Sequence, residues 1–181
     1  MKLYFLIICF FTPILKANAE PIHDAASSGD LQAVKLLLTE DFSLLEKKDP
    51  NGFTPLLSAC VAKKTEIAEY LIKQGANVNV KTPYGFTPLL FACNGLTLDN
   101  NLIKLLLLNG ADVNAHLDRG LSAMHWIGIT DNLEAARLLI DHGANLDVKD
   151  NDCYGTVLHM SINLGISEKM TGDKLCVNIQ P

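Results

Sequence analysis

The sequence predicts an all-α protein, a solenoid of repeated helix pairs, and three observations support this fold class. A nine-residue phrase, GFTPLLSAC from Gly52, returns almost unchanged as GFTPLLFAC from Gly85. A second phrase, GANVNV from Gly75, returns as GADVNA from Gly110 and as GANLDV from Gly143. Between these phrases, apolar residues recur every three or four positions, the spacing of one helix face. Two phrases alternating at a period of about 33 residues indicate a stacked array of short units.

The composition limits the function classes. The chain has 181 residues, of which 49% are hydrophobic and 19% charged, and its formal net charge is −5. This length suits one domain or a short repeat array, and the hydrophobic content indicates a folded protein. An acidic chain without a basic stripe is not expected to bind nucleic acid.

The first nineteen residues are predicted to be a cleaved signal peptide. Lys2 precedes the apolar stretch LYFLIICFFTPIL, and an Ala-Asn-Ala cleavage pattern at 17–19 precedes Glu20. The stretch is shorter than the ~20 residues that cross a bilayer, although a membrane anchor is the alternative. We therefore expect an exported protein, periplasmic or secreted, that does not insert into a membrane after cleavage.

Each unit is expected to begin with a capped helix. The Thr-Pro step recurs as Thr54-Pro55 and Thr87-Pro88, then as Ser122-Ala123 and Thr156. Threonine can accept hydrogen bonds from the first turn of a helix, and proline at the first helical position loses no bond. The short apolar segments that follow predict an inner helix with small alanines where neighbouring helices approach.

A second helix should follow in each unit and end at a glycine. Its apolar stripe is Leu31, Val34, Leu37 and Leu38 in the first unit, and similar stripes follow in the next three. Gly75, Gly110 and Gly143 stand where a helix can end in a left-handed residue.

These phrases resemble ankyrin repeats over about residues 21–164. The resemblance implies four repeats, at about 20–49, 50–82, 83–117 and 118–150, with a partial fifth at 151–165 and a degenerate tail at 166–181. Three departures stand out in the array: Asp41-Phe42 replaces the first glycine, NGLTLDNN adds about two residues to the third unit, and an extra residue falls near Asp152. We expect the third unit to have a longer inter-helix turn.

The histidines are expected to be structural. His23, His125 and His159 occupy one position of the repeat, which Leu57 and Leu90 fill in the other units. In the family this histidine hydrogen-bonds within and between repeats. No zinc-protease, nucleophile-elbow, phosphate-loop or EF-hand pattern is present, and Asp147 to Cys153 lacks the ligand spacing of a calcium loop. We therefore expect no enzymatic activity, no cofactor and no metal.

Four cysteines remain after signal cleavage. Cys60 and Cys93 occupy equivalent positions of adjacent repeats, whose helices should stand ~8–10 Å apart, too far for a disulfide. We expect them to be buried thiols. Whether Cys153 and Cys176 form a disulfide stays open.

The variable positions beside the turn glycines are the predicted contacts with a partner. Aromatic residues and arginine are frequent in binding hot spots, and the predicted contact residues are Asn51, Phe53, Tyr84, Phe86, Arg119, Leu121 and Tyr154. The alternative for Phe53, Phe86 and Leu121 is that they pack between neighbouring loops. Trp126 is expected to lie in the core.

The resemblance implies a non-catalytic protein–protein interaction module that binds through its loop tips and concave inner helices. The acidic net charge favours a basic protein partner, and we expect a monomer. A signal peptide joined to ankyrin repeats is typical of bacterial exported proteins. One role expected for such a binding protein is the neutralisation of a toxin or enzyme. The alternatives are a host-directed effector and a structural or stress-protective envelope protein without a tight partner.

Overall fold

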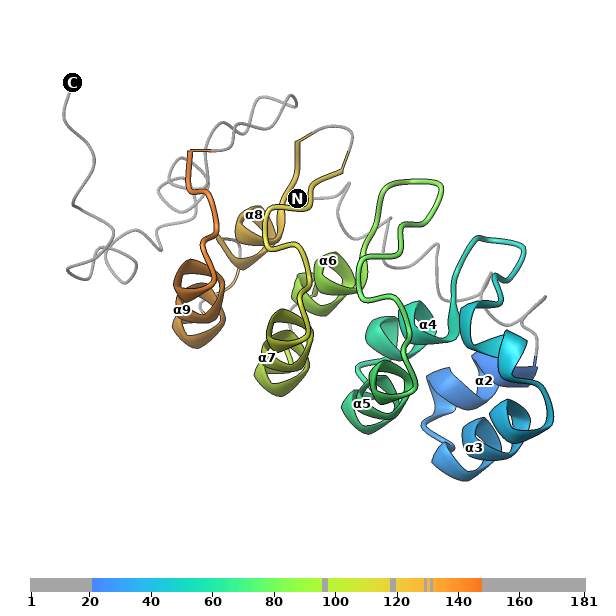
Figure 1. Ribbon diagram of the computed structural model, residues 1–181. Coiled ribbons are helices and arrows are strands. Elements are labelled where there is room, and N and C mark those ends of the chain that lie inside the picture. The colour runs from blue at the N-terminus through green and yellow to red at the C-terminus, as the bar shows by residue number, and fades with distance from the viewer. Residues whose placement is uncertain (1–20, 96–97, 118–119, 129, 131, 148–181) are drawn as a thin grey trace, which may run out of the picture.

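The helices of this protein lie in two parallel rows (Figure 1). The computed structural model describes residues 21–95, 98–117, 120–128, 130 and 132–147. The inner row consists of α2 (Pro21–Ser28), α4 (Pro55–Val61), α6 (Pro88–Cys93) and α8 (Ala123–Gly128). The outer row consists of α3 (Leu31–Glu40), α5 (Thr65–Lys73), α7 (Asn100–Leu108) and α9 (Leu133–Asp141). A short 3-10 helix, η1 (Phe42–Glu46), follows α3. The described residues thus form four helix pairs and no β-strand, as the all-α prediction requires.

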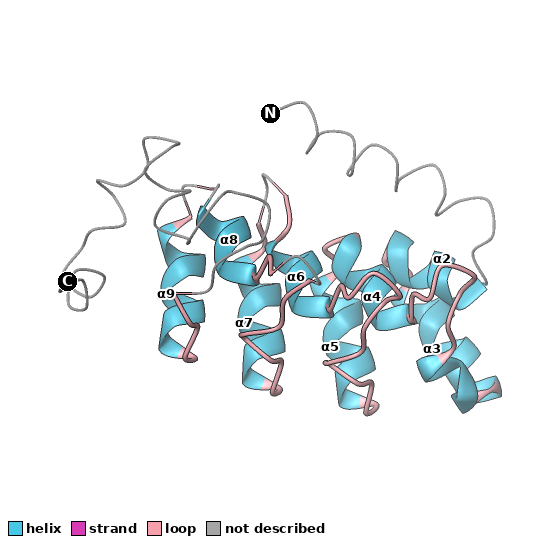
Figure 2. Cartoon of the chain, turned by 90° about the horizontal axis from the view of Figure 1, so that it is seen from above, coloured by secondary structure: helices cyan, strands magenta, loops and turns pink. Residues whose placement is uncertain are grey.

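Each inner helix contacts its outer partner and the next inner helix, so the pairs stack in chain order (Figure 2). One continuous hydrophobic core runs between the rows. The predicted apolar stripes supply it: Val34 and Leu38 of α3 are buried, as are Ile67 and Leu71 of α5. Trp126 of α8 is also buried in this core, as expected.

The sequence signals for helix ends act as predicted. The side chains of Thr54 and Thr87 accept hydrogen bonds from the backbone N–H groups of Leu57 and Leu90, and a proline opens each helix. Gly75, Gly110 and Gly143 have φ angles of +98°, +84° and +84°. At these angles the Cβ of another residue would be strained against its own backbone, so glycine ends the outer helices.

Two of the three predicted departures have a structural basis, and the third, near Asp152, lies outside the described residues. Residues 94–99 separate α6 from α7, whereas only 62–64 separate α4 from α5, so the third inter-helix turn is longer as expected. Asp41, which stands near the missing first glycine, caps η1 by accepting from the Ser43 N–H. This short helix takes the place of the glycine turn that follows the other outer helices.

Polar side chains join the loops that follow the outer helices. Asn79 donates from Nδ2 to the Gly110 carbonyl (2.9 Å) and accepts at Oδ1 from the Asp112 N–H (2.8 Å). Asn114 repeats both bonds with Gly143 (3.1 Å) and Asn145 (2.7 Å). In the first unit, Glu46 accepts from the Asn77 N–H (2.7 Å). These bonds connect the loops of successive units, in addition to the contacts between their helices.

Candidate functional site

Three loops of one design lead into the inner helices. We call them finger loops and define them as residues 47–53, 80–86 and 115–121. Each is closed by the same backbone hydrogen bond, from Asp49 N to Phe53 O, from Thr82 N to Phe86 O and from Leu117 N to Leu121 O, each 2.9 Å. The described residues at the same place in the three loops are therefore structurally equivalent.

Side chains inside the loops fix their shape. Oδ1 of buried Asp49 accepts from the backbone N–H groups of Asn51 (2.9 Å) and Phe53 (2.8 Å), and Thr82 Oγ1 accepts from the Phe86 N–H (3.1 Å). A Cβ built on Gly52 would lie 2.5 Å from Cδ of Pro83, because the first two finger loops are in close contact. The first two finger loops are thus held by internal bonds and by contact with each other.

An aromatic cluster lies where the second finger loop meets the inner helices. Phe91 of α6 stacks on Phe86, with ring centroids 4.7 Å apart and planes at 15°, and its centroid is 5.4 Å from that of Phe53. Both Phe86 and Phe91 are half-buried and therefore keep surface that a partner can reach. Offset or tilted aromatic pairs at such separations stabilise beyond the area they bury.

The predicted contact residues divide into four groups: buried, half-buried, exposed and outside the described residues. Phe53 is 1% exposed and packs with Leu57 and Val80, so the packing alternative describes it and its prediction as a contact is wrong. Phe86 and Leu121 are half-buried and pack against the core, and Asn51 is half-buried with its side-chain amide 3.4 Å from Asp49 Oδ2. Tyr84 is 65% exposed at the tip of the second finger loop. Arg119 and Tyr154 lie outside the described residues.

Two residues at this site were missed in the sequence. Phe91 is one, although the single difference between the nine-residue phrases, Ser58 against Phe91, marked its position. Lys63 is the other, a lysine in the α4–α5 turn with a φ of +54°. Its Nζ donates to the carbonyls of Phe91 (2.6 Å), Ala92 (2.8 Å) and Asn94 (3.1 Å). Lys63 thereby caps the carboxyl end of the next inner helix, where the helix dipole favours a cation.

The pKa values of the groups near Lys63 are perturbed by burial. Burial lowers the pKa of Lys63, and the neighbouring Cys93, Cys60 and Asp99 oppose that change. Burial raises the pKa of Cys60 and of Cys93 to about 12, and Lys63 opposes it in each case. The two cysteines are buried and free, as the sequence predicted, and thiols with such pKa values are poor nucleophiles near neutral pH.

The described histidines of the repeat position hold the framework together. His23 is buried, and its Nε2 donates to the carbonyls of Phe53 (2.8 Å) and Lys47 (3.0 Å), which joins α2 to the first finger loop. His125 Nδ1 accepts from the Ser122 N–H (3.2 Å) and lies 2.8 Å from Ser122 Oγ at the start of α8. These bonds are the structural role expected for this histidine. His159 falls outside the described residues, as do Cys153 and Cys176.

The described residues contain neither a metal-binding cluster nor a membrane-spanning helix. Within residues 21–147, apart from the few positions not described, no three His, Cys, Asp or Glu side chains gather as a metal ion requires. In that part of the chain, too, no helix combines the length and hydrophobicity needed to cross a bilayer. The candidate site is therefore a binding surface formed by the finger loops and the inner helices.

Comparison with known proteins agrees with this geometry. Residues 22–98 and 94–171 match the family described as ankyrin repeats (3 copies). A Fowlpox virus protein named for its ankyrin repeats is 32% identical over 130 residues, which is 69% of this chain and 38% of the viral protein. Ankyrin repeat and SOCS box protein 16 of Homo sapiens is 27% identical over 167 residues, 81% of this chain and 36% of that protein.

A third relative, the transient receptor potential cation channel subfamily A member 1 of Homo sapiens, is 32% identical over 152 residues. The match covers 82% of this chain and 13% of the channel. The chain therefore spans only a minor part of each of these relatives, and what it shares with them is the repeat array. The chain belongs to the ankyrin repeat family.

Proposed function

We propose that this protein binds a partner protein through one continuous surface, formed by the finger loops and the inner helices α4 and α6. Ankyrin repeats act as protein–protein interaction modules, so the question is which part of the array makes the contact. The observation that carries the proposal is the half-buried Phe86–Phe91 stack beside Tyr84, which is 65% exposed.

The arrangement has the features of a binding hot spot. Aromatic side chains supply large contact area at a small cost in conformational entropy, and hot spots are enriched in tyrosine. The loop that carries Tyr84 and Phe86 is held by the internal bonds of Thr82 and by the contact of Pro83 with the first finger loop. A surface that is ordered before binding loses less freedom in the complex.

The proposal includes a compartment and a role. The protein acts as a non-catalytic monomer in the periplasm or extracellular space after cleavage of residues 1–19, and it neutralises a toxin or enzyme there. The apolar stretch and Ala-Asn-Ala pattern of the N-terminus support the compartment.

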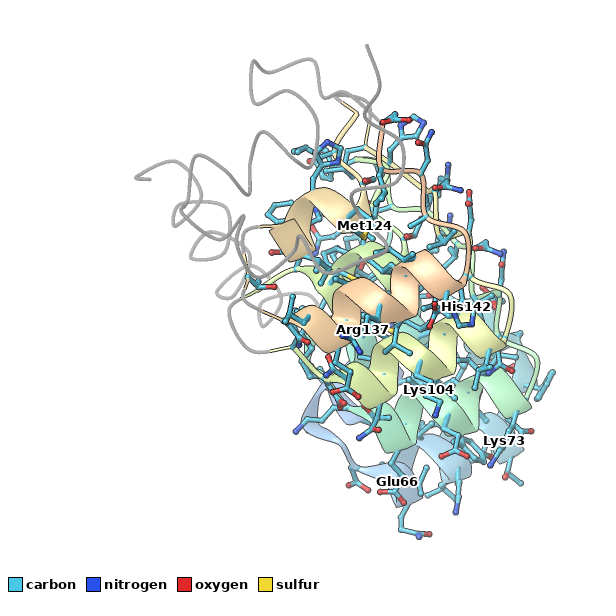
Figure 3. The ribbon with its side chains drawn as sticks, turned by 90° about the vertical axis from the view of Figure 1, so that its left-hand side faces the viewer. Glu66, Lys73, Lys104, Met124, Arg137 and His142 are labelled. Carbon is cyan, nitrogen blue, oxygen red and sulfur yellow. The ribbon has the colours of Figure 1, made fainter. Side chains whose placement is uncertain are left out.

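Affinity capture from the native host tests the contact surface. The immobilised chain is compared with the double variant Tyr84→Ala, Phe91→Ser, which places at position 91 the residue of the preceding repeat. Lys104→Ala is the control, because Lys104 is exposed on outer helix α7 (Figure 3). We expect a specific partner to be held at least ~10-fold more weakly by the double variant and equally by the control.

Capture of every specific partner by the folded double variant would refute this surface, and so would the absence of any partner for the unaltered chain. Circular dichroism of both variants shows whether they fold. The same preparation tests the compartment, since protein recovered from the host should begin at Glu20. A chain that still begins at Met1 contradicts export through a cleaved signal.

A further inference from the structure

The finger loops carry a row of basic residues on an otherwise acidic protein. Lys48, Lys81 and His116 each precede the residue whose N–H closes its finger loop. Since the three closures are the same, these side chains start from equivalent points of adjacent loops. All three are exposed.

Three carboxylates near this row, among the described residues, accept hydrogen bonds from backbone N–H groups. Asp49 is buried and accepts two N–H groups of its own loop. Glu46 accepts from the Asn77 N–H, and Asp112 accepts from the Asn114 N–H (2.9 Å). Lys48 and Lys81, in contrast, make no hydrogen bond or ion pair with the described residues. Their charges are therefore available to a partner.

Acidic groups gather instead at the opposite end of the helices. Asp30, Glu66, Asp99 and Glu134 all lie at the starts of the outer helices, next to the inter-helix turns. Inner helices α4, α6 and α8 each follow a finger loop and end near an inter-helix turn, so the length of the inner helix separates the two edges. Among the described residues, Lys63 and Lys64 of the α4–α5 turn are the basic side chains at that end, and the Lys63 ammonium is already bonded to the carboxyl end of α6. Lys48 and Lys81 therefore form a basic edge at the other end of the inner helices.

We propose that the basic edge formed by Lys48, Lys81 and His116 binds an acidic segment of the partner protein, with its carboxylates facing the lysines. This inference rests on the proposed function and specifies the chemistry of the partner at the finger loops. The net charge alone favours a basic partner, whereas this inference assigns an acidic one. The reason is that a contact depends on the local electrostatic potential and not on the net charge of the whole chain.

Nucleic acid fits this edge poorly. A duplex-binding protein commonly neutralises ~6–10 phosphates, and two lysines with one histidine fall well short of that. Carboxylates spaced along an extended chain, which rises ~3.3 Å per residue, can reach successive finger loops ~10 Å apart.

Fluorescence anisotropy with defined probes tests the inference. The probe is a labelled twelve-residue peptide of alternating glycine and glutamate, compared with the same peptide carrying glutamine or lysine instead of glutamate. The proteins are the full chain, the double variant Lys48→Glu, Lys81→Glu, and the control Lys104→Glu on the outer row (Figure 3). We expect the glutamate peptide to bind the unaltered chain most tightly and the double variant about 10-fold more weakly. The control should equal the unaltered chain, and added salt should weaken binding.

Equal binding of the glutamate and glutamine peptides overturns the inference, as does preference for the lysine peptide or for a single-stranded oligonucleotide of equal length. If the charge-reversed variant does not fold, the double variant Lys48→Gln, Lys81→Gln replaces it, and its affinity for the glutamate peptide should also be lower than that of the unaltered chain. The proposed function is judged separately by the capture experiment. If the double variant Tyr84→Ala, Phe91→Ser loses the partner and the double variant Lys48→Glu, Lys81→Glu keeps it, the two hypotheses separate. The proposed function is then supported, and the inference of an acidic segment is refuted.

Discussion

Among single residues, the exchange of Ser58 for Phe91 distinguishes two otherwise almost identical inner helices. The phrases around them are conserved within the chain because each residue meets the same local demand: threonine caps, proline opens, and alanine allows close packing. Phe91 meets no such demand. It contacts the finger loops of two successive units through Phe53 and Phe86, so it shapes the surface at one place in the array.

The buried cysteines give a prediction at this same scale. The pKa of each thiol is about 12 in the folded protein against an ordinary 9.0. Because the folded pKa is raised, the stabilisation is complete below pH 9 and is lost as the pH rises toward 12. At about pH 10.5 the loss should approach about 2 kcal/mol per thiol.

Urea unfolding at pH 8 and near pH 10.5 measures this loss. The double variant Cys60→Ala, Cys93→Ala is less stable at pH 8, since it removes buried volume. Its stability should nevertheless fall less than that of the unaltered chain over the same pH interval. An equal fall in both proteins would show that the thiols are accessible to solvent in the folded state.

At the scale of elements, the helices are connected by side chains that serve the neighbouring unit. Lys63 leaves the α4–α5 turn and caps α6, and Thr65 Oγ1 lies 2.5 Å from Asp99 Oδ2, the cap of α7. Both links join one unit to the next. A helix of the length of α6 is not stable alone in water, so such contacts matter to its formation.

Lys63→Met should therefore lower the free energy of unfolding by about 1–3 kcal/mol, because three carbonyls at the end of α6 lose a charged donor. Lys64→Met is the matched control, since Lys64 also precedes α5 but makes no cap bond through its side chain. Its effect should stay within about 0.5 kcal/mol. Chemical denaturation of both variants measures their free energies of unfolding. Equal losses of stability in the two variants would mean that Lys63 does not cap α6.

At the scale of the whole molecule, local patterns predicted the helix pairs but not the contacts between them. The caps at Thr54 and Thr87 and the glycine at Gly75 depend on residues within one turn of the chain, so the sequence contains their full explanation. The bonds of Lys63 and Asn79 join residues about thirty positions apart and exist only once units have stacked.

The predicted contact residues also separate into features set by local sequence and features set by contacts between units. The exposure of Tyr84 follows from the turn pattern, which marks the tips of loops, and its contact with a partner stays a prediction. Phe53 was misplaced because its burial depends on Phe91 and on the second finger loop, which no pattern within its own unit reveals. Phe91 was overlooked for the same reason.

The central claim is that the partner contacts the finger-loop side of the array and not the outer row. Two positions with nearly equal exposure allow a direct test: Tyr84 is 65% exposed on a finger loop, and Leu108 is 66% exposed at the end of outer helix α7. A photo-reactive benzophenone amino acid is introduced at one or the other position, and the chain is irradiated in its native host. We predict a cross-linked partner from position 84 and none from position 108; a partner cross-linked only from position 108 would contradict the account.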